Sequence, residues 1–159
     1  MEEKTMIREA TRDDVKALAG LYKDLLVFHN QLDRKKYNVP DDDACDKRLE
    51  WFLEFSDIYK MLCHETDGVV DGYVVYMLPD KNSAKENNDG VITVNSIVVA
   101  EDARGNGIGE ELINEMLKLA KENYCNTITV DVHLYNGMAR KFFEKMGMIP
   151  TTIHLEKRL

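Results

Sequence analysis

The chain has 159 residues, of which 44% are hydrophobic and 31% charged, a composition that predicts one folded domain over residues 1–159 and excludes a disordered chain. Its formal net charge of −8 at pH 7 argues against binding along a nucleic-acid backbone. The three cysteines, Cys45, Cys63 and Cys125, are widely spaced, so we expect neither a disulfide framework nor a metal site.

The start of the chain and its cysteines bear on where the protein works. Residues 1–4 are charged rather than apolar, so we expect no signal peptide. No apolar run has the length of a membrane span, and we therefore expect no membrane partner. Unpaired cysteines favour a reducing, cytoplasmic setting.

The N-terminal third predicts a strand, a helix, an exposed loop and a second helix. A short alternating segment is followed by a sequence that resembles a capping box, Thr11-Arg12-Asp13-Asp14. Apolar residues then recur at helical spacing, stop in a polar stretch and resume. The expected ranges are residues 5–10 for the strand, 15–28 for the first helix, 29–43 for the loop and 43–55 for the second helix.

The rest of the chain predicts strands that alternate with helices. Two segments rich in β-branched and aromatic residues, separated by Asp-Gly turns, indicate paired antiparallel strands. A polar connection over residues 79–90 precedes the next strand. The remaining expected ranges are strands at 58–65, 72–78, 91–100, 127–134 and 152–155, and helices at 107–123 and from 136 to about 146.

A glycine-rich turn joins the strand that ends at Ala100 to the following helix. It contains Arg104-Gly105-Asn106-Gly107-Ile108-Gly109. The first backbone N–H groups of a helix have no partner within it, and the helix dipole adds positive charge there, so phosphate can bind. Glycine lets a diphosphate approach the backbone, and Arg104 can add charge-assisted hydrogen bonds. The pattern fits neither the dinucleotide fingerprint nor the P-loop.

Two motifs resemble the GCN5-related N-acetyltransferase (GNAT) family. Arg104, Gly107 and Gly109 match its Arg-x-x-Gly-x-Gly signature. Residues 136–148 resemble its Asn-x-x-Ala-x-x-φ-Tyr-Glu-Lys-φ-Gly-Phe segment, in which φ is apolar. The motifs stand in the family's order and at about its spacing, and the resemblance extends over residues 6–155.

The resemblance implies an α/β fold with a mixed, mostly antiparallel sheet of about six to seven strands, splayed in the middle and flanked by about four helices. It implies acetyl-coenzyme A as cosubstrate. The pantetheine arm would pair with one strand and contact the second motif, while the turn would hold the diphosphate. The cofactor-binding residues implied in this way are Ile97, Val98, Val99, Arg104, Gly105, Asn106, Gly107, Ile108, Gly109 and Asn136.

The implied reaction is transfer of an acetyl group, by direct attack, to a primary amine of a small molecule or peptide. The family commonly places a proton-donating Tyr where this chain has Phe143, and Phe has no hydroxyl to give. Catalytic candidates are therefore Tyr135 and His133, with Tyr73 and Tyr76 as further hydroxyl groups. Alternation predicts that the His133 ring lies opposite the apolar row of its strand, where it could equally be a solvated histidine.

Phe143 also leaves open a second interpretation, a non-catalytic GNAT-like module that binds or senses acyl-coenzyme A. A nucleotide-binding regulator is a third, which the glycine spacing disfavours. The acceptor amine, the general base and the oligomeric state are not given by the sequence, although the expected final strand at 152–155 suggests a homodimer.

Overall fold

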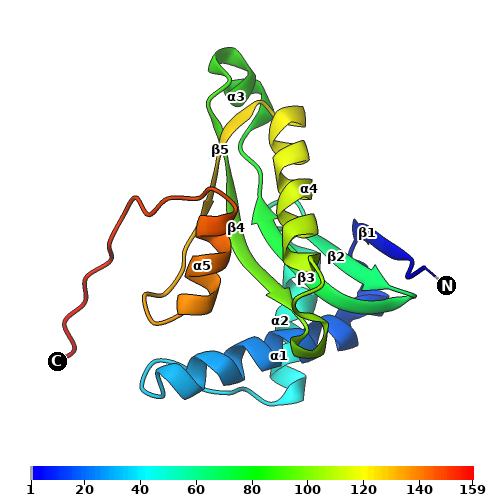
Figure 1. Cartoon of the computed structure of the whole chain (residues 1–159), viewed down its shortest axis with the longest axis vertical. Helices are drawn as coiled ribbons and strands as arrows, with labels where there is room; N and C mark the ends of the chain where they lie inside the picture. Colours follow the sequence, from blue (N-terminus) through cyan, green and yellow to red (C-terminus); the bar gives the residue numbers. More distant parts are fainter. Residues whose placement is uncertain (1) are drawn as a thin grey trace.

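The computed structural model describes residues 2–159. In this part of the chain, five strands form one sheet in the order β1-β2-β3-β4-β5, with helices against both faces (Figure 1). The elements are β1 Thr5–Glu9, η1 Arg12–Asp14, α1 Val15–Leu32, α2 Asp42–Glu54, β2 Lys60–Thr66, β3 Val69–Met77, α3 Lys81–Asn87, β4 Gly90–Val99, η2 Glu101–Ala103, α4 Ile108–Glu122, β5 Cys125–Val130 and α5 Gly137–Lys145.

The sheet is mixed, as the resemblance implied. β1 to β4 are antiparallel neighbours, whereas β5 runs parallel to β4 and is reached through α4. Among residues 2–159 there are five strands and five α-helices, so the expected six to seven strands and four helices were each slightly wrong. The strand expected at 152–155 does not form, and α3 occupies the connection expected to be irregular.

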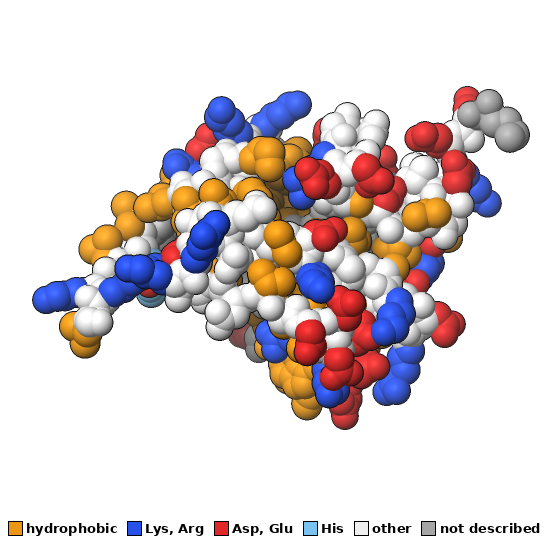
Figure 2. All heavy atoms as spheres, turned by 90° about the horizontal axis from the view of Figure 1, so that it is seen from below, with side chains coloured by type: hydrophobic (Ala, Val, Ile, Leu, Met, Phe, Trp, Pro, Cys, Tyr) orange, Lys and Arg blue, Asp and Glu red, His pale blue; other side chains and the backbone are white. Residues whose placement is uncertain are grey.

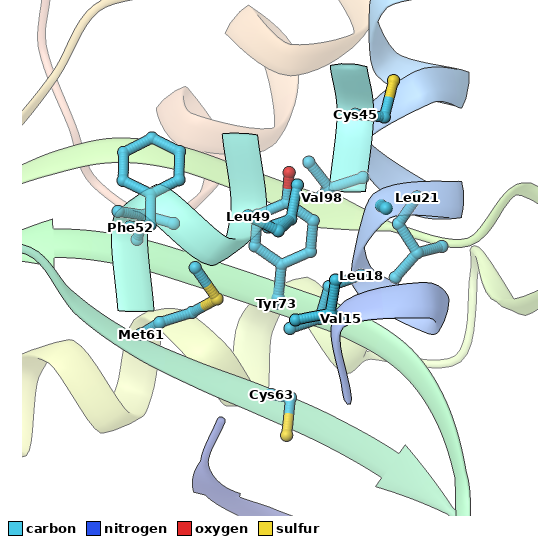
Figure 3. Close-up of a cluster of buried hydrophobic side chains, with 12 residues drawn as sticks. Val15, Leu18, Leu21, Cys45, Leu49, Phe52, Met61, Cys63, Tyr73 and Val98 are labelled. Atoms are coloured by element: carbon cyan, nitrogen blue, oxygen red, sulfur yellow. The ribbon is translucent and has the colours of Figure 1, made fainter. Parts of the chain in front are cut away.

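Two hydrophobic cores lie on opposite faces of the sheet. On one face, α1 and α2 cover side chains of β2, β3 and β4, and Figure 3 shows Met61 and Tyr73 of these strands meeting Leu18 and Leu49 of the helices. On the other face, α4 covers the intervening residues of the same strands, including Val74. Because successive residues of a strand face opposite ways, one sheet supplies both cores.

The sheet splits between β4 and β5. The two strands pair only from Gly90↔Cys125 to Val94↔Val130. A bulge follows, at which the partners of β3 skip Asn95. β4 then continues to Val99 with β3 on one side and, among the described residues, no strand on the other. The backbone of the last part of β4 therefore has one open edge.

Several predicted boundaries were wrong for identifiable reasons. α1 runs to Leu32 rather than residue 28, since a helix adds a hydrogen bond per residue until something stops it, and residues 29–32 contain no breaker. β5 ends at Val130 rather than 134, because the chain turns where the N–H of Asn136 donates to the carbonyl of His133 at 2.9 Å. α3 begins at an Asp80 cap and buries only Ala84, too little to leave a periodic pattern.

The predicted capping box is confirmed, although it opens the short turn η1 rather than α1 directly. The N–H of Thr11 donates to the Asp14 carboxylate at 2.7 Å. Arg8 of β1 also binds Asp14, with guanidinium–carboxylate distances of 2.8 and 2.9 Å. These contacts tie the start of α1 to the first strand.

The C-terminal tail, residues 148–159, is extended beyond α5 (Figure 1), and its end contacts the segment after α1, where Arg158 lies 2.6 Å from Asp33. Its alternating apolar residues are exposed, with Ile153 at 71% and Leu155 at 86%. Figure 2 shows hydrophobic side chains gathered on the side where this tail lies. The homodimer was suggested because a final strand was expected at 152–155, and this strand does not form. Of residues 2–159, no helix combines the length and apolarity that crossing a bilayer demands.

Candidate active site

The glycine-rich turn is shaped by backbone conformation. Gly105 and Gly107 both have φ of +81°, a left-handed geometry that other residues adopt only at a cost. Gly107 begins α4 without a side-chain cap, and the first helical bond runs from the N–H of Glu111 to the Gly107 carbonyl at 2.9 Å. The N–H groups before Glu111 consequently have no acceptor within the helix. A side chain at Gly105 or Gly107 would meet no described atom within 4 Å.

Gly109 has a different role. A Cβ there would lie 3.0 Å from Cζ of Phe142 in α5, so the glycine lets α5 pack against the first turn of α4. The sequence did not reveal this packing role. It links the two motifs physically, because Gly109 belongs to the first and Phe142 to the second.

Arg104 and Asn106 fold back onto the chain beside the turn. Nε of Arg104 donates to the carbonyl of Val99 at 3.2 Å, and the amide of Asn106 donates to the carbonyl of Ala103 at 3.0 Å. Both residues are exposed. The guanidinium therefore lies where the open edge of β4 runs into the turn.

The register of β4 shows which residues present their backbone to the open edge. The N–H of Ala100 donates to the carbonyl of Asp71 at 2.8 Å, so this pair is hydrogen-bonded and, by antiparallel alternation, so is Val98 with Tyr73. Ile97 and Val99 must then point their N–H and C=O groups away from β3. Two of the three predicted strand residues thus face the gap, whereas the backbone of Val98 is directed toward β3.

The second motif begins with the N-cap of α5. The side-chain oxygen of Asn136 accepts from the N–H of Ala139 at 3.1 Å and starts α5. Phe143, at the position where the family commonly has Tyr, is only 6% exposed and packs edge-on against Phe142. It offers neither a hydroxyl nor a free ring face to a substrate.

Tyr73 and Tyr76 do not fit the role of proton donor. They are 1% and 5% exposed, and burial raises the pKa of Tyr76 to about 12 and that of Tyr73 further still. A donor must come within hydrogen-bond reach of the reacting atoms. Burial removes both from the list of candidates.

Four rings from three segments meet beyond the end of β5, and we call them the His–Tyr cluster: His29 of α1, Tyr37 of the segment after α1, and His133 and Tyr135 of the turn between β5 and α5. The Tyr37 hydroxyl shares a hydrogen bond with Nε2 of His133, and the Tyr135 hydroxyl lies 3.3 Å from Nδ1 of His29. The rings of His133 and Tyr135 stack with centroids 5.0 Å apart.

The structure corrects the expected place of His133 and adds His29 and Tyr37 to the candidate site residues. His133 does not alternate on a strand, because β5 ends at Val130 and His133 opens a turn. Burial lowers the pKa of both His29 and His133 below the ordinary histidine value. A neighbouring basic group lowers each pKa further, the His133 imidazole for His29 and the Lys36 ammonium for His133. His29 and Tyr37 escaped sequence analysis because they fall in a region without periodicity.

A buried polar network supports the start of α4 from the sheet. His64 of β2, which is fully buried, lies between two carboxylates, with Nδ1 2.5 Å from Asp71 and Nε2 3.0 Å from Glu111. The Thr66 hydroxyl donates to the other Asp71 oxygen at 2.6 Å. Glu111 belongs to the first turn of α4, so the network connects that turn to β2 and β3. The sequence placed His64 in a predicted strand at 58–65 and gave no sign of its two carboxylate partners.

Comparison with known proteins agrees with both motifs. A model of the acetyltransferase (GNAT) family matches residues 25–148. An uncharacterized N-acetyltransferase of Methanocaldococcus jannaschii is 34% identical over 89 residues, which are 52% of this chain and 48% of that protein. The chain thus spans about half the length of this curated relative.

Solved structures share the whole fold at low identity. A tetramutant of the BH1408 protein from Bacillus halodurans has a TM-score of 0.85 and 20% identity, covering 97% of this chain and 99% of that one. An aminoglycoside N-acetyltransferase in complex with coenzyme A has 0.71 and 19%, covering 100% and 97%. Glucosamine-6-phosphate N-acetyltransferase from Arabidopsis thaliana has 0.67 and 20%, covering 98% of each chain.

Proposed function

The chain belongs to the acetyltransferase (GNAT) family, and from this we propose that it transfers an acetyl group from acetyl-coenzyme A to a primary amine of a small molecule or peptide. The observation that carries the proposal is the gap between β4 and β5. There, an open strand edge runs directly into a helix N-terminus that lacks a side-chain cap.

The residues around the gap fit the two chemical parts of the cosubstrate. An amide-containing arm can add to the open edge of β4 as a strand would, using the outward N–H groups of Ile97 and Val99 and the outward C=O of Ile97, while the C=O of Val99 accepts from Arg104. A diphosphate can accept from the free N–H groups at the start of α4, with Arg104 adding positive charge. Asn106, Ile108 and Asn136 complete the proposed lining, and Gly105 and Gly107 leave room for the phosphates.

The proposed chemistry is direct attack. Bound acetyl-coenzyme A supplies an activated acetyl group as a thioester. The protein holds the acceptor nitrogen as a neutral amine, and outward N–H groups of β4 would donate to the carbonyl oxygen as negative charge develops on it. Such preorganised donors contribute a large share of the rate enhancement in acyl transfer.

The departing thiolate needs a proton that α5 does not provide. Phe143 has no hydroxyl, and Tyr73 and Tyr76 are buried away from any substrate. Among the candidate tyrosine hydroxyl groups, Tyr135 is the exposed one, and it directly precedes Asn136. We assign this role to Tyr135 or to water that reaches the gap.

Three further features are consistent with the proposal. The similar aminoglycoside and glucosamine-6-phosphate enzymes are named for amine-bearing small molecules, and a net charge of −8 suits a cationic amine. The two cores share one sheet, which supports a single acetyltransferase domain over residues 1–159. The three cysteines are buried and free, which suits a reducing compartment such as the cytoplasm.

Two measurements test the function. Acetyl-coenzyme A at about 100 times its dissociation constant should stabilise the fold by about 2.7 kcal/mol, which a thermal melt detects. No stabilisation would contradict the cosubstrate assignment. Thiol release with a panel of amines then distinguishes an enzyme from a non-catalytic acyl-coenzyme A sensor, the alternative that the absence of a hydroxyl at Phe143 leaves open. A sensor binds acetyl-coenzyme A without releasing thiol.

A further inference from the structure

A hydrogen bond in the His–Tyr cluster joins the two groups through which a proton can pass. The Tyr37 hydroxyl and Nε2 of His133 are within hydrogen-bond reach of each other. In the neutral tautomer whose Nε2 carries no proton, this nitrogen accepts from the hydroxyl. A neutral His133 can therefore take up one proton, through the hydroxyl that it already contacts.

The surroundings of His133 keep its ring neutral. Burial is the main cause that lowers its pKa, and Lys36 adds to it. The facing groups that oppose this shift are carboxylates, two of which are partly neutralised by Arg158, at 2.6 Å from Asp33 and 3.3 Å from Glu156. The titratable or charged groups around His133 are His29 of α1, Asp33, Lys36 and Tyr37 of the following segment, Asp131 and Tyr135 of its own segment, and Glu156 of the tail.

The cluster also lies close to the proposed pantetheine site. The N–H of Asn136 donates to the carbonyl of His133 at 2.9 Å and closes a turn. The α-carbons at the two ends of such a turn are less than about 7 Å apart. His133 is thus fixed beside Asn136, at the side of the gap formed by β5 and α5.

We propose that Tyr37 and His133 form a proton relay that deprotonates the amine acceptor, an inference that rests on the proposed acetyl transfer. The ammonium N–H bond breaks as its proton passes to the Tyr37 oxygen, and the hydroxyl proton of Tyr37 passes to Nε2 of His133. The lone pair left on the amine forms the bond to the acetyl carbon as the carbon–sulfur bond breaks, and the proton that the nitrogen then loses passes to the departing thiolate by way of Tyr135 or water. His133, now an imidazolium, returns its proton to water. His29 is a positioning residue, whereas Tyr135, stacked on His133, keeps its proposed role as a donor to the departing thiolate.

Two amines of nearly equal shape test the relay. Ethylamine is an ammonium ion at neutral pH and must lose a proton, whereas methoxyamine is already a free amine and need not. Substituting His133→Gln or Tyr37→Phe should lower kcat/KM for ethylamine by about 100-fold or more and leave methoxyamine within about threefold, since general base catalysis is lost for one substrate only. His154→Gln, at an exposed tail histidine, is the matched control and should change neither.

The outcomes separate the relay from the function on which it rests. An equal loss for both amines would mean that the cluster is structural, and the relay would be wrong while acetyl transfer stands. Failure of the wild-type protein to release thiol with these two amines and with every other amine of the panel, although acetyl-coenzyme A binds, would contradict transfer itself. In the wild type, kcat/KM for ethylamine should fall as pH drops through the His133 pKa, and the methoxyamine profile should lack that limb.

A second measurement needs no acceptor. The ring resonances of His133 can be assigned by their loss in His133→Gln and followed by NMR as a function of pH. We expect a ring that is neutral at neutral pH, with its pKa below the ordinary histidine value. A protonated ring at neutral pH would overturn the relay, because an imidazolium cannot accept the proton.

Discussion

Substituting Gly107→Ala tests the glycine-rich turn with little steric disturbance of the protein itself. Gly107 has φ of +81°, and no described atom lies within 4 Å of the position of an added Cβ. The cost to folding is therefore the left-handed backbone alone, about 1–2 kcal/mol. In a chain of this length, each kcal/mol lowers the melting temperature by roughly 2–4 °C.

The effect on binding should exceed this conformational cost. The added methyl group projects into the space beside the free N–H groups of α4, where the diphosphate is proposed to bind. We expect the affinity for acetyl-coenzyme A to fall at least about tenfold, which is about 1.4 kcal/mol. Isothermal titration gives the affinity, and chemical denaturation without ligand gives the stability of the same variant.

Gly68→Ala is the matched control. Gly68 lies in the β2–β3 turn with the same φ of +81° and the same empty surroundings, so it should lose the same stability. Its affinity for acetyl-coenzyme A should be unchanged. If both variants bind with wild-type affinity, the diphosphate does not lie at Gly107. If both lose affinity equally, the loss reflects destabilisation and not the site.

Three further substitutions test contacts that stabilise the fold. Arg8 holds the pKa of Asp14 down to about 2, so this carboxylate contributes about 2 kcal/mol above its unfolded pKa and loses it as pH falls toward 2. Acid denaturation of Asp14→Asn should be correspondingly flatter over that range. His64→Leu should lower the free energy of unfolding by roughly 3–5 kcal/mol, because it leaves buried Asp71 without its partner; a loss below about 1 kcal/mol in urea denaturation would refute this. Phe143→Tyr should destabilise by about 1–3 kcal/mol without raising turnover, since the ring is 6% exposed and the substitution buries a hydroxyl group in an apolar site; faster thiol release would show that its para position reaches the gap.

The sequence was sufficient for the features that arise from local pattern. Helical spacing, turn residues and glycine positions predicted the turn at Arg104–Gly109 and the start of a helix at Asn136, each within one short segment. The sequence could not show that the backbone of Val98 faces β3 while that of its neighbours faces the open edge, because this depends on the register of β4 against β3. One residue of slip would exchange the bonded and the open positions.

Contacts between distant segments account for the other omissions. The His–Tyr cluster joins residues that are up to 106 positions apart, and two of its four members, His29 and Tyr37, do not stand out in their own segments. The role of His64 likewise depends on its contact with Glu111, which is 47 positions away. Gly109 resembled a phosphate-binding glycine, yet its immediate neighbour is a phenylalanine of another helix. Sequence spacing identifies such residues but does not identify their partners.

The helix N-termini explain why the gap has one side suited to an anion. α2, α3 and α5 begin with side-chain caps, Asp41, Asp80 and Asn136, each of which satisfies a free N–H group. α4 begins at Gly107 with no such cap. Its first turn carries two acidic residues, Glu110 and Glu111, and Glu111 is bound by His64. A carboxylate left free at that end would compete with a phosphate for the same N–H groups and the same positive potential. The His64 network thus serves the turn indirectly, by engaging one of these two acidic side chains.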